Sequence, residues 1–205
     1  MKAGAVITAA GKSSRMGSFK PLLKIGSFTA AEHVIRNFHA AGIMDIALVT
    51  GSNAEELENS LKRLNVIFLR NEMYEHNEMF DSVKIGLNHM KDTCDRIFLT
   101  PVDAPLFAPD TVKLLLNSKA NVGIPVYKKE TGRPIILDSD AVKKILAYSG
   151  SGGLRDVITK LSLDIEYVET GDHGMLFDMD TPEDYRKIIE LFDNFSFEKP
   201  HMTQA

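Results

Sequence analysis

Short apolar runs alternate with longer amphipathic segments along most of the chain. Buried strands are predicted for the apolar runs, which cover residues 3–9, 46–50, 66–69, 96–100 and 122–126. Helices are predicted for the segments of helical period, which cover residues 29–41, 53–64, 81–90, 109–117, 139–148 and 181–192. Strands that alternate with helices favour right-handed crossovers and a parallel sheet covered by helices on both faces. We therefore expect an α/β fold, a three-layer Rossmann-like sandwich with a mainly parallel sheet.

Turn and cap residues predict where several of these elements begin or end. Gly42 is expected to end the first helix, and Asn53 is positioned to cap the second. The sequence from Thr181 to Asp184 offers a capping hydroxyl, a proline at the first helical position and then two acids. Residues 128–132 lie between two apolar runs and have the composition of a hairpin turn, which predicts one small antiparallel excursion of the sheet.

Composition and length restrict the class of protein. Hydrophobic residues make up 44% and charged residues 25% of 205 residues, which is typical of a soluble globular domain. We expect one domain over residues 1–193 and a polar C-terminal tail over 194–205. Because Cys94 is the sole cysteine, an intramolecular disulfide and a cysteine-cluster metal site are excluded. No signal peptide and no apolar run of about 20 residues is seen. A cytoplasmic monomer or homodimer without a membrane partner is therefore expected.

Charge is distributed unevenly along the chain. The net charge of −4 argues against a broad nucleic-acid-binding surface, which would usually carry a basic excess. Residues 1–36, however, contain six cationic residues and one acidic residue, a local balance of +5 against −9 for the remainder. A basic segment on an acidic body indicates a local site for an anion.

The loop after the first strand holds half of these cations. It combines two glycines, two serines and three cationic residues: Gly11, Gly17, Ser13, Ser14, Lys12, Arg15 and Lys20. Open parallel sheets bind ligands beyond the carboxyl ends of their strands, and glycines allow backbone N–H groups to turn toward an anion. The loop therefore predicts a polyphosphate site. It is not a P-loop, because Val6 stands where that motif needs glycine, and it lacks the three glycines of a dinucleotide fingerprint.

The segment from Ala9 to Gly17, followed by Lys20, resembles the A-A-G-x-S-x-R-M-G-x-x-K signature of nucleotidyltransferases. More closely, it is similar to the branch that contains the molybdenum-cofactor cytidylyltransferases and guanylyltransferases, and the similarity extends from about residue 3 to 192. The resemblance implies that Arg15 and Lys20 hold a triphosphate, with Asp103 as the third catalytic residue. The implied nucleotide-binding residues are Ala9, Ala10, Gly11, Lys12, Ser13, Ser14, Arg15, Met16, Gly17, Lys20 and Ser82.

Nucleotidyl transfer needs a divalent cation to offset charge on the pyrophosphate, and Mg²⁺ binds through one or two carboxylates. Asp103 follows the strand that ends at residue 102, on the edge of the first loop, in a context similar to the family's D-x-P-L. Residues 178–184 resemble the family's D-I-D-T-P-E-D motif. Mg²⁺ is thus expected on Asp103 and Asp178, with Asp180 as the alternative to Asp178. We assign Asp184 to the start of the helix. No general base is expected, because a phosphate acceptor is already ionised near neutral pH.

Two further segments are similar to substrate-binding parts of this family. Residues 77–87 resemble G-M-x-x-S-[IL]-x-x-G-L, which implies that Ser82 contacts the nucleobase, although Glu78 and Asp81 depart from the pattern. Residues 132–137 are similar to the G-x-P strand near the acceptor, and residues 149–156 to the G-x-R segment that follows it. The implied acceptor-binding residues are Gly132, Arg133, Pro134 and Arg155.

The resemblance implies Mg²⁺-dependent transfer of a nucleoside monophosphate, with CTP favoured and GTP as the alternative, to a phosphorylated small molecule. A molybdopterin-type cofactor is the favoured acceptor, and pyrophosphate is the by-product. Methylerythritol-phosphate cytidylyltransferases typically carry D-A-A-R-P where this chain has Asp103-Ala-Pro-Leu106, which counts against that branch. Phosphocholine and sugar-phosphate nucleotidyltransferases stay open, because residues 20–26 also resemble their loops. The alternative of another class is a nucleotide-binding regulatory protein without turnover.

Overall fold

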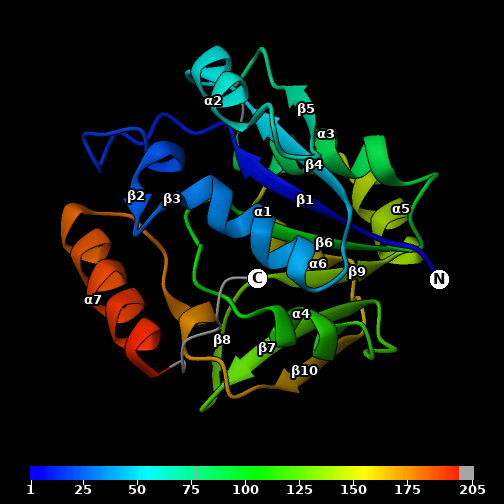
Figure 1. The fold of residues 1–205 in the computed structure, drawn as a ribbon. Helices are drawn as coiled ribbons and strands as arrows, with labels where there is room; N and C mark the ends of the chain where they lie inside the picture. Colours follow the sequence, from blue (N-terminus) through cyan, green and yellow to red (C-terminus); the bar gives the residue numbers. More distant parts are fainter. Residues whose placement is uncertain (77, 199–205) are drawn as a thin grey trace.

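The computed structural model describes residues 1–76 and 78–198, and its centre is one large, mostly parallel sheet (Figure 1). The strand order is β10-β7-β9-β6-β1-β4-β5, and the short strand β8 pairs with β7. The bounds are Ala3–Ala9 for β1, Asp45–Thr50 for β4, Ile67–Arg70 for β5, Arg96–Pro101 for β6, Val122–Tyr127 for β7, Glu130–Thr131 for β8, Ile135–Asp138 for β9 and Ile165–Glu169 for β10. The five strands predicted from apolar runs are thereby confirmed.

Strand β1 lies between β4 and β6 and runs parallel to both. Ala5 pairs with Ile46 on one side and with Phe98 on the other. Strand β9 runs antiparallel to both β6 and β7, and β8 forms a hairpin with β7. Lys128 and Lys129 at the hairpin turn have φ values of 48° and 75°, the left-handed conformation that a tight two-residue turn requires. The predicted antiparallel excursion is confirmed.

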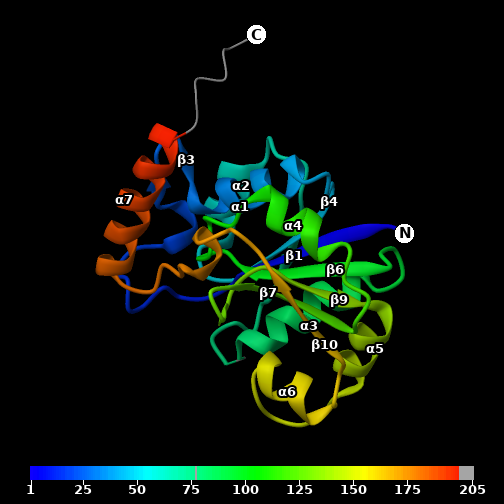
Figure 2. The same cartoon turned by 90° about the horizontal axis from the view of Figure 1, so that it is seen from below.

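Helices cover both faces of the sheet (Figure 2). On one face lie α1 (Ala30–Ala40), α2 (Ala54–Leu61) and α4 (Pro109–Leu115). On the other face lie α3 (Met79–Met90), α5 (Ser139–Ala147) and α6 (Leu154–Lys160). Each face has its own buried apolar cluster, because the side chains of a strand point alternately to its two faces. The three-layer α/β sandwich predicted from the sequence is confirmed.

The last helix, α7 (Pro182–Glu198), packs outside these layers against a small hairpin of β2 (Lys24–Ile25) and β3 (Phe28–Thr29) (Figure 1). A third apolar cluster joins them and includes Met16, Ile25, Met179 and Ile188. The C-terminal helix therefore packs against the β2–β3 hairpin, which follows the first loop in the sequence. The predicted domain boundary at residue 193 falls inside α7, and residues 199–205 of the predicted tail lie outside the described residues.

Several caps form as predicted, and one does not. Gly42 follows the end of α1 with a φ of 89°, and Thr181 and Asp184 bond to each other at the start of α7. Thr29 and Glu32 also make a reciprocal capping box at α1, which was not predicted. Asn53 occupies the predicted N-cap position of α2, but its φ of 51° is left-handed and its side chain makes no capping hydrogen bond.

The β2–β3 hairpin, α6 and β10 were not predicted. No helix was predicted over the glycine-rich residues 149–156, but α6 begins at Leu154, so Arg155 lies in a helix. Strand β10 has three exposed residues out of five and therefore lacks an apolar run. None of the helices within residues 1–76 and 78–198 has the length and apolar character needed to cross a membrane.

Candidate active site

A polar cavity of about 240 Å³ lies at the carboxyl ends of β1 and β6. The backbone N–H of Val102 donates to the carbonyl of Thr8, so the two strand ends stay paired at this edge. Parallel neighbours place their carboxyl ends together, and the loops after both strands therefore meet here. The predicted residues that line this cavity are Ala9, Ala10, Gly11, Ser13, Ser14, Arg15, Lys20, Ser82, Asp103 and Asp180.

The first loop is shaped by its own backbone. Ser13 has a φ of 53°, and its carbonyl accepts a hydrogen bond from the N–H of Met16 over 3.0 Å. Its hydroxyl accepts from the N–H of Lys20 over 3.2 Å, which ties the two ends of the loop together. Gly17 has a φ of 69°, where glycine is favoured.

Gly11 has a different reason to be glycine. Its φ is outside the left-handed region, and no atom lies within 4 Å of the place where a Cβ would stand. The fold therefore does not require glycine at this position. Because Gly11 lines the polar cavity, the missing side chain leaves room for a ligand close to the backbone.

Three residues predicted to bind nucleotide do not line this cavity. The ammonium of Lys12 pairs with Glu75 at 3.0 Å, and Met16 is buried in the cluster beneath α7. Gly17 forms the left-handed turn of the loop. These residues shape the loop or lie on its outer side.

Lys20 joins two carboxylates that come from distant parts of the chain. Its Nζ lies 2.9 Å from Oδ2 of Asp103 and 2.7 Å from Oδ1 of Asp180. Arg15 adds a second cation, with an Nη2 that lies 3.2 Å from Oδ2 of Asp180. The side chain of Lys20 is only 11% exposed, whereas that of Arg15 is 72% exposed. The basic loop and the acidic body therefore meet in one site.

Lys20 is held in its charged form. Burial alone would lower its pKa, but the hydrogen bonds and charges of Asp180 and Asp103 outweigh that effect and raise the pKa above its ordinary value. An ammonium that is paired with two carboxylates keeps its charge at neutral pH.

Asp178 and Asp180 lie on opposite sides of the chain segment around Met179. The N–H of Met179 donates to the carbonyl of Asp103 over 2.8 Å, and the side chains on either side of Met179 diverge from this bond. Asp180 lines the polar cavity, and Asp178 lines a second one. Asp178 is exposed to solvent at this cavity, and protein atoms of the cavity wall lie beside its carboxyl. Burial, followed by the negative charge of Asp103, raises the pKa of Asp178 to about 6.

The donor set of this site fits a divalent cation. Two carboxylate oxygens, from Asp103 and Asp180, already converge on one cationic centre, the Nζ of Lys20. Mg²⁺ sites commonly take one or two carboxylates and complete their octahedron with phosphate oxygens and water. Among the described side chains, no three Asp, Glu, His or Cys residues are grouped as a ready-made metal site. A metal here would need ligands from a bound phosphate as well.

Helix α3 supplies the far wall of the polar cavity. Ser82 is buried, and its hydroxyl accepts a hydrogen bond from the side-chain amide of Asn71 over 3.0 Å. Gly86 allows this helix to lie directly on β1, because a Cβ there would overlap the side chain of Val6. Sequence reasoning missed Asn71, Tyr74, Glu78 and Met79 as lining residues. Glu78 departs from the motif of residues 77–87 and Met79 matches it, whereas Asn71 and Tyr74 lie outside any motif.

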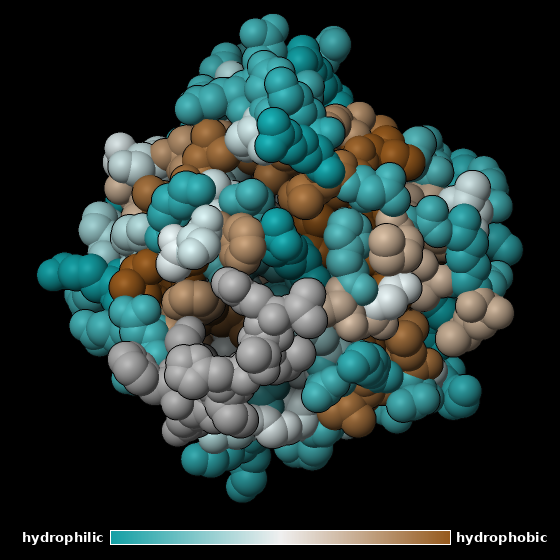
Figure 3. Space-filling view, in the orientation of Figure 1, coloured by the Kyte–Doolittle hydropathy of each residue, from teal (hydrophilic) through white to brown (hydrophobic). Residues whose placement is uncertain are grey.

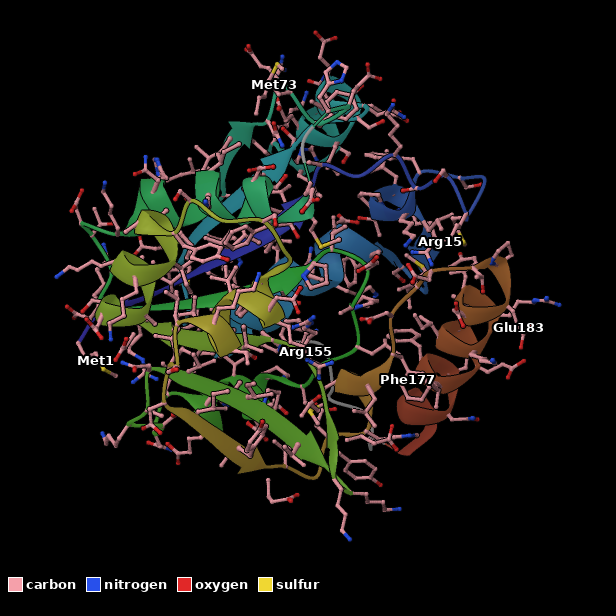
Figure 4. All side chains as sticks on the ribbon, turned by 180° about the vertical axis from the view of Figure 1, so that it is seen from behind. Met1, Arg15, Met73, Arg155, Phe177 and Glu183 are labelled. Atoms are coloured by element: carbon pink, nitrogen blue, oxygen red, sulfur yellow. The ribbon has the colours of Figure 1, made fainter. Side chains whose placement is uncertain are left out.

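A second cavity, of about 630 Å³, adjoins the first. The two share Thr8, Met79 and Pro101. Aliphatic side chains make up much of its wall, and its charged lining residues are Arg133, Arg155 and Asp178. Figure 4 shows Arg15 beside the chain that enters α7, and Arg155 between α6 and the β7–β8 hairpin.

The structure brings three of the four predicted acceptor-binding residues to this second cavity. They are Gly132, Arg133 and Arg155. Pro134 is buried beneath the cavity and does not line it. On the face drawn in Figure 3, apolar side chains show as separate patches between hydrophilic ones. Two of the large apolar side chains that are exposed, Met79 and Tyr167, line the second cavity.

Comparison with known proteins identifies the family of this chain. The model of the MobA-like NTP transferase domain matches residues 5–165. The molybdenum cofactor cytidylyltransferase of Escherichia coli K12 is 28% identical over 182 residues, which cover 88% of this chain and 92% of that protein. The bifunctional protein GlmU of Staphylococcus haemolyticus is 30% identical over 119 residues, which cover 57% of this chain but only 26% of GlmU.

Solved structures share the fold. A nucleotidyl transferase from Methanothermobacter superposes with a TM-score of 0.83 over 95% of this chain and 99% of its own, at 22% identity. A Mycobacterium tuberculosis H37Rv protein in complex with manganese gives 0.75 at 19% identity, over 93% and 99% of the two chains. The CMP:2-keto-3-deoxy-manno-octonic acid synthetase in complex with CTP gives 0.74 at 18% identity, over 95% and 100%. The family match covers well over half of the sequence, and the chain therefore belongs to the MobA-like NTP transferase domain family and is a nucleotidyltransferase.

Proposed function

We propose that this enzyme transfers CMP from CTP to a phosphorylated small molecule, a molybdopterin-type cofactor, and releases pyrophosphate. The observation that carries the proposal is the pair of adjoining cavities that share Thr8, Met79 and Pro101. Two substrates bound in adjoining cavities can bring their reacting groups together at the shared rim. Such alignment supplies much of the rate enhancement in a two-substrate reaction.

The polar cavity is the proposed CTP site. The backbone of the first loop would wrap the β- and γ-phosphates, with Arg15 and Lys20 as catalytic cations. The space at Gly11 supports close approach of a phosphate to the backbone. Ser82 is the proposed contact for the base, and its position on the wall opposite the first loop supports this role.

Asp103 and Asp180 are the proposed ligands of a Mg²⁺ ion. The ion would offset the negative charge that develops on the pyrophosphate as it leaves. Asp103 serves as the third catalytic residue, because it also contacts Lys20. Asp178 is assigned instead to the rim of the acceptor cavity, which it lines together with Arg133.

The second cavity is the proposed acceptor site. Arg133 and Arg155 would bind the acceptor's phosphate, and the apolar walls would contact its ring system. An oxygen of that phosphate forms a bond to the α-phosphorus of CTP, and the bond between the α-phosphorus and the α–β bridging oxygen breaks. Because the phosphate is already ionised, no side chain has to remove a proton.

The relatives support the choice of nucleotide and metal. The Escherichia coli relative that aligns along most of both chains is named as a cytidylyltransferase, and one structural neighbour holds CTP. Another neighbour holds manganese, a divalent ion that commonly substitutes for magnesium. These properties belong to those proteins, and their agreement with the donor set of this site supports the proposal.

The proposal is tested by a matrix of nucleotides and acceptors. The protein is incubated with Mg²⁺, each of the four nucleoside triphosphates, and either molybdopterin, methylerythritol phosphate, phosphocholine or a sugar phosphate, and pyrophosphate is measured. We expect the fastest release with CTP and molybdopterin. Faster release with GTP would show that GTP is the nucleotide substrate in place of CTP. Faster release with another acceptor would show that this acceptor is the substrate in place of molybdopterin. Tight CTP binding without pyrophosphate from any pair would contradict the assignment.

A further inference from the structure

The ammonium of Lys20 lies between the two carboxylates proposed to hold the metal. It is 2.9 Å from Asp103 and 2.7 Å from Asp180, and it is the sole side-chain cation within hydrogen-bonding distance of both among the described residues. A Mg²⁺ ion needs ligand oxygens at about 2.0–2.1 Å and would have to occupy much of the same space. Lys20 and the metal therefore compete for one pair of carboxylates.

We propose that Lys20 is an internal counter-ion that keeps this pair of carboxylates closed to a divalent cation until a nucleotide binds. A bound triphosphate would draw the ammonium toward itself and leave the carboxylates of Asp103 and Asp180 free to hold a divalent cation. Lys20 is in this respect a positioning residue that controls when the metal site opens. The inference rests on the proposed function, because it assigns the metal to these two carboxylates.

The backbone of Lys20 is fixed, but its ammonium can move a short distance. The N–H of Lys20 donates to Ser13, and its carbonyl accepts from the N–H of Leu23, so the Cα position is held at both sides. Lysine carries its charge on a flexible four-carbon stem and has three N–H donors. Two of them are used by the carboxylates, and the third is available for a phosphate oxygen. The exchange needs a change of side-chain rotamer and no change of fold.

Arg15 cannot play the same part. It contacts Asp180 alone, at 3.2 Å, and its side chain is 72% exposed. An exposed ion pair contributes little because water screens it, whereas the ion pairs of Lys20 are mostly enclosed. Removing the charge of Lys20 leaves Asp103 and Asp180 without their shared counter-ion, and a metal becomes the obvious substitute.

The exchange predicts that nucleotide and metal bind cooperatively. By thermodynamic linkage, CTP increases the affinity for the metal by the same factor by which the metal increases the affinity for CTP. Part of this factor comes from phosphate oxygens that bind the metal directly. The other part comes from moving Lys20, and it disappears when Lys20 is replaced by a neutral side chain.

The test measures Mn²⁺ binding to the full-length protein without nucleotide, by calorimetry and by electron paramagnetic resonance. Wild type should bind Mn²⁺ weakly, and Lys20→Met should bind it roughly tenfold or more tightly. Arg15→Met removes an equal charge from the exposed position and should change the affinity by at most about fivefold. The gain of Lys20→Met should vanish when Asp103→Asn is added. Circular dichroism checks the folding of each variant, and Lys20→Gln serves as the second variant if Lys20→Met does not fold.

The outcomes separate this inference from the proposed function. One outcome is that wild type binds Mn²⁺ in the presence of CTP, whereas without nucleotide the Lys20 variants bind Mn²⁺ no more tightly than wild type does. The counter-ion role of Lys20 is then wrong, and the assignment of the metal to Asp103 and Asp180 stands. If wild type binds no Mn²⁺ even with CTP, the metal assignment fails and the inference fails with it. A nucleotide-free gain that persists after Asp103→Asn would also overturn the inference, because the metal would then bind elsewhere.

Discussion

The side-chain amide of Asn71 donates a hydrogen bond to the hydroxyl of Ser82 over 3.0 Å and so joins the loop after β5 to helix α3. The Asn71 side-chain oxygen also accepts from the N–H of Met73, which fixes the orientation of the amide. Because the Ser82 oxygen acts as the acceptor, its own proton is directed elsewhere. Ser82 lines the polar cavity and can donate that proton to a carbonyl or ring nitrogen of a base, groups that cytosine offers.

Ser82→Ala should therefore weaken CTP binding by about 2- to 10-fold, the loss of one ordinary hydrogen bond. Calorimetry with CTP measures the effect. Ser60→Ala is a matched control, because the Ser60 hydroxyl bonds to the Leu57 carbonyl on α2, away from both cavities. Equal CTP affinity of Ser82→Ala and wild type would remove Ser82 from the base site.

Gly11 and Gly86 should respond in opposite ways to replacement by alanine. Gly11→Ala should leave the free energy of unfolding nearly unchanged and weaken CTP binding, because the new methyl group enters the cavity without touching protein atoms. Gly86→Ala should reduce the free energy of unfolding by about 1–3 kcal/mol, because its methyl group would overlap Val6. Urea denaturation and CTP calorimetry on both variants check this contrast. A Gly11→Ala protein with normal CTP affinity would argue that the phosphates lie elsewhere.

Arg155 is expected to act on the acceptor alone. It lines the second cavity but not the first, so Arg155→Met should raise the KM for the acceptor about 10-fold or more and leave the KM for CTP within about twofold. Steady-state rates of pyrophosphate release, with each substrate varied in turn, separate the two constants. Arg63→Met, an exposed cation outside both cavities, is the control. An increase of both constants by the same factor would contradict two separate sites.

His33 should make stability depend on pH on the acid side. Burial lowers the pKa of His33 below its ordinary value, and the positive charge of Arg36 adds to this effect. The Ile25 carbonyl, which accepts a hydrogen bond from Nε2 over 2.7 Å, and the negative charge of Glu32 raise the pKa by a smaller amount. The folded protein thus favours neutral His33, while the unfolded chain takes up a proton near its ordinary pKa of about 6.5. The free energy of unfolding should be unaffected by His33 above that pH and should fall as the pH drops below it. His33→Gln should show a shallower fall in urea titrations between pH 7.5 and 5.5, and an unchanged slope would contradict this explanation.

The part of the site that follows from strand ends could be predicted from the sequence. An apolar run such as residues 3–9 is local information, and parallel strands bring their carboxyl ends to one edge whatever the details. Position alone therefore placed the first loop and Asp103 at the same edge. It also indicated that the basic segment and the acidic body would meet.

The rest depends on contacts that no local pattern contains. Asp178 and Asp180 have equal chemistry and nearly equal spacing, and the bond from Met179 to the Asp103 carbonyl directs Asp180 toward Lys20. Asn71 lies in a loop without a motif and becomes a cavity residue through its contact with Ser82. Strand β10 lies at the edge of the sheet, where exposure removes the apolar signal that identified the inner strands.

Pyrophosphate release by wild type and Asp103→Asn, with CTP, Mg²⁺ and molybdopterin, tests the central claim most directly. Asn has nearly the shape of Asp but no charge, so it can neither neutralise Lys20 nor bind the metal as a carboxylate does. Wild type should release pyrophosphate, and Asp103→Asn should retain the same circular dichroism spectrum with a rate at least about 100-fold lower. Pyrophosphate release by Asp103→Asn at the wild-type rate would contradict the assignment of this cavity as the catalytic site.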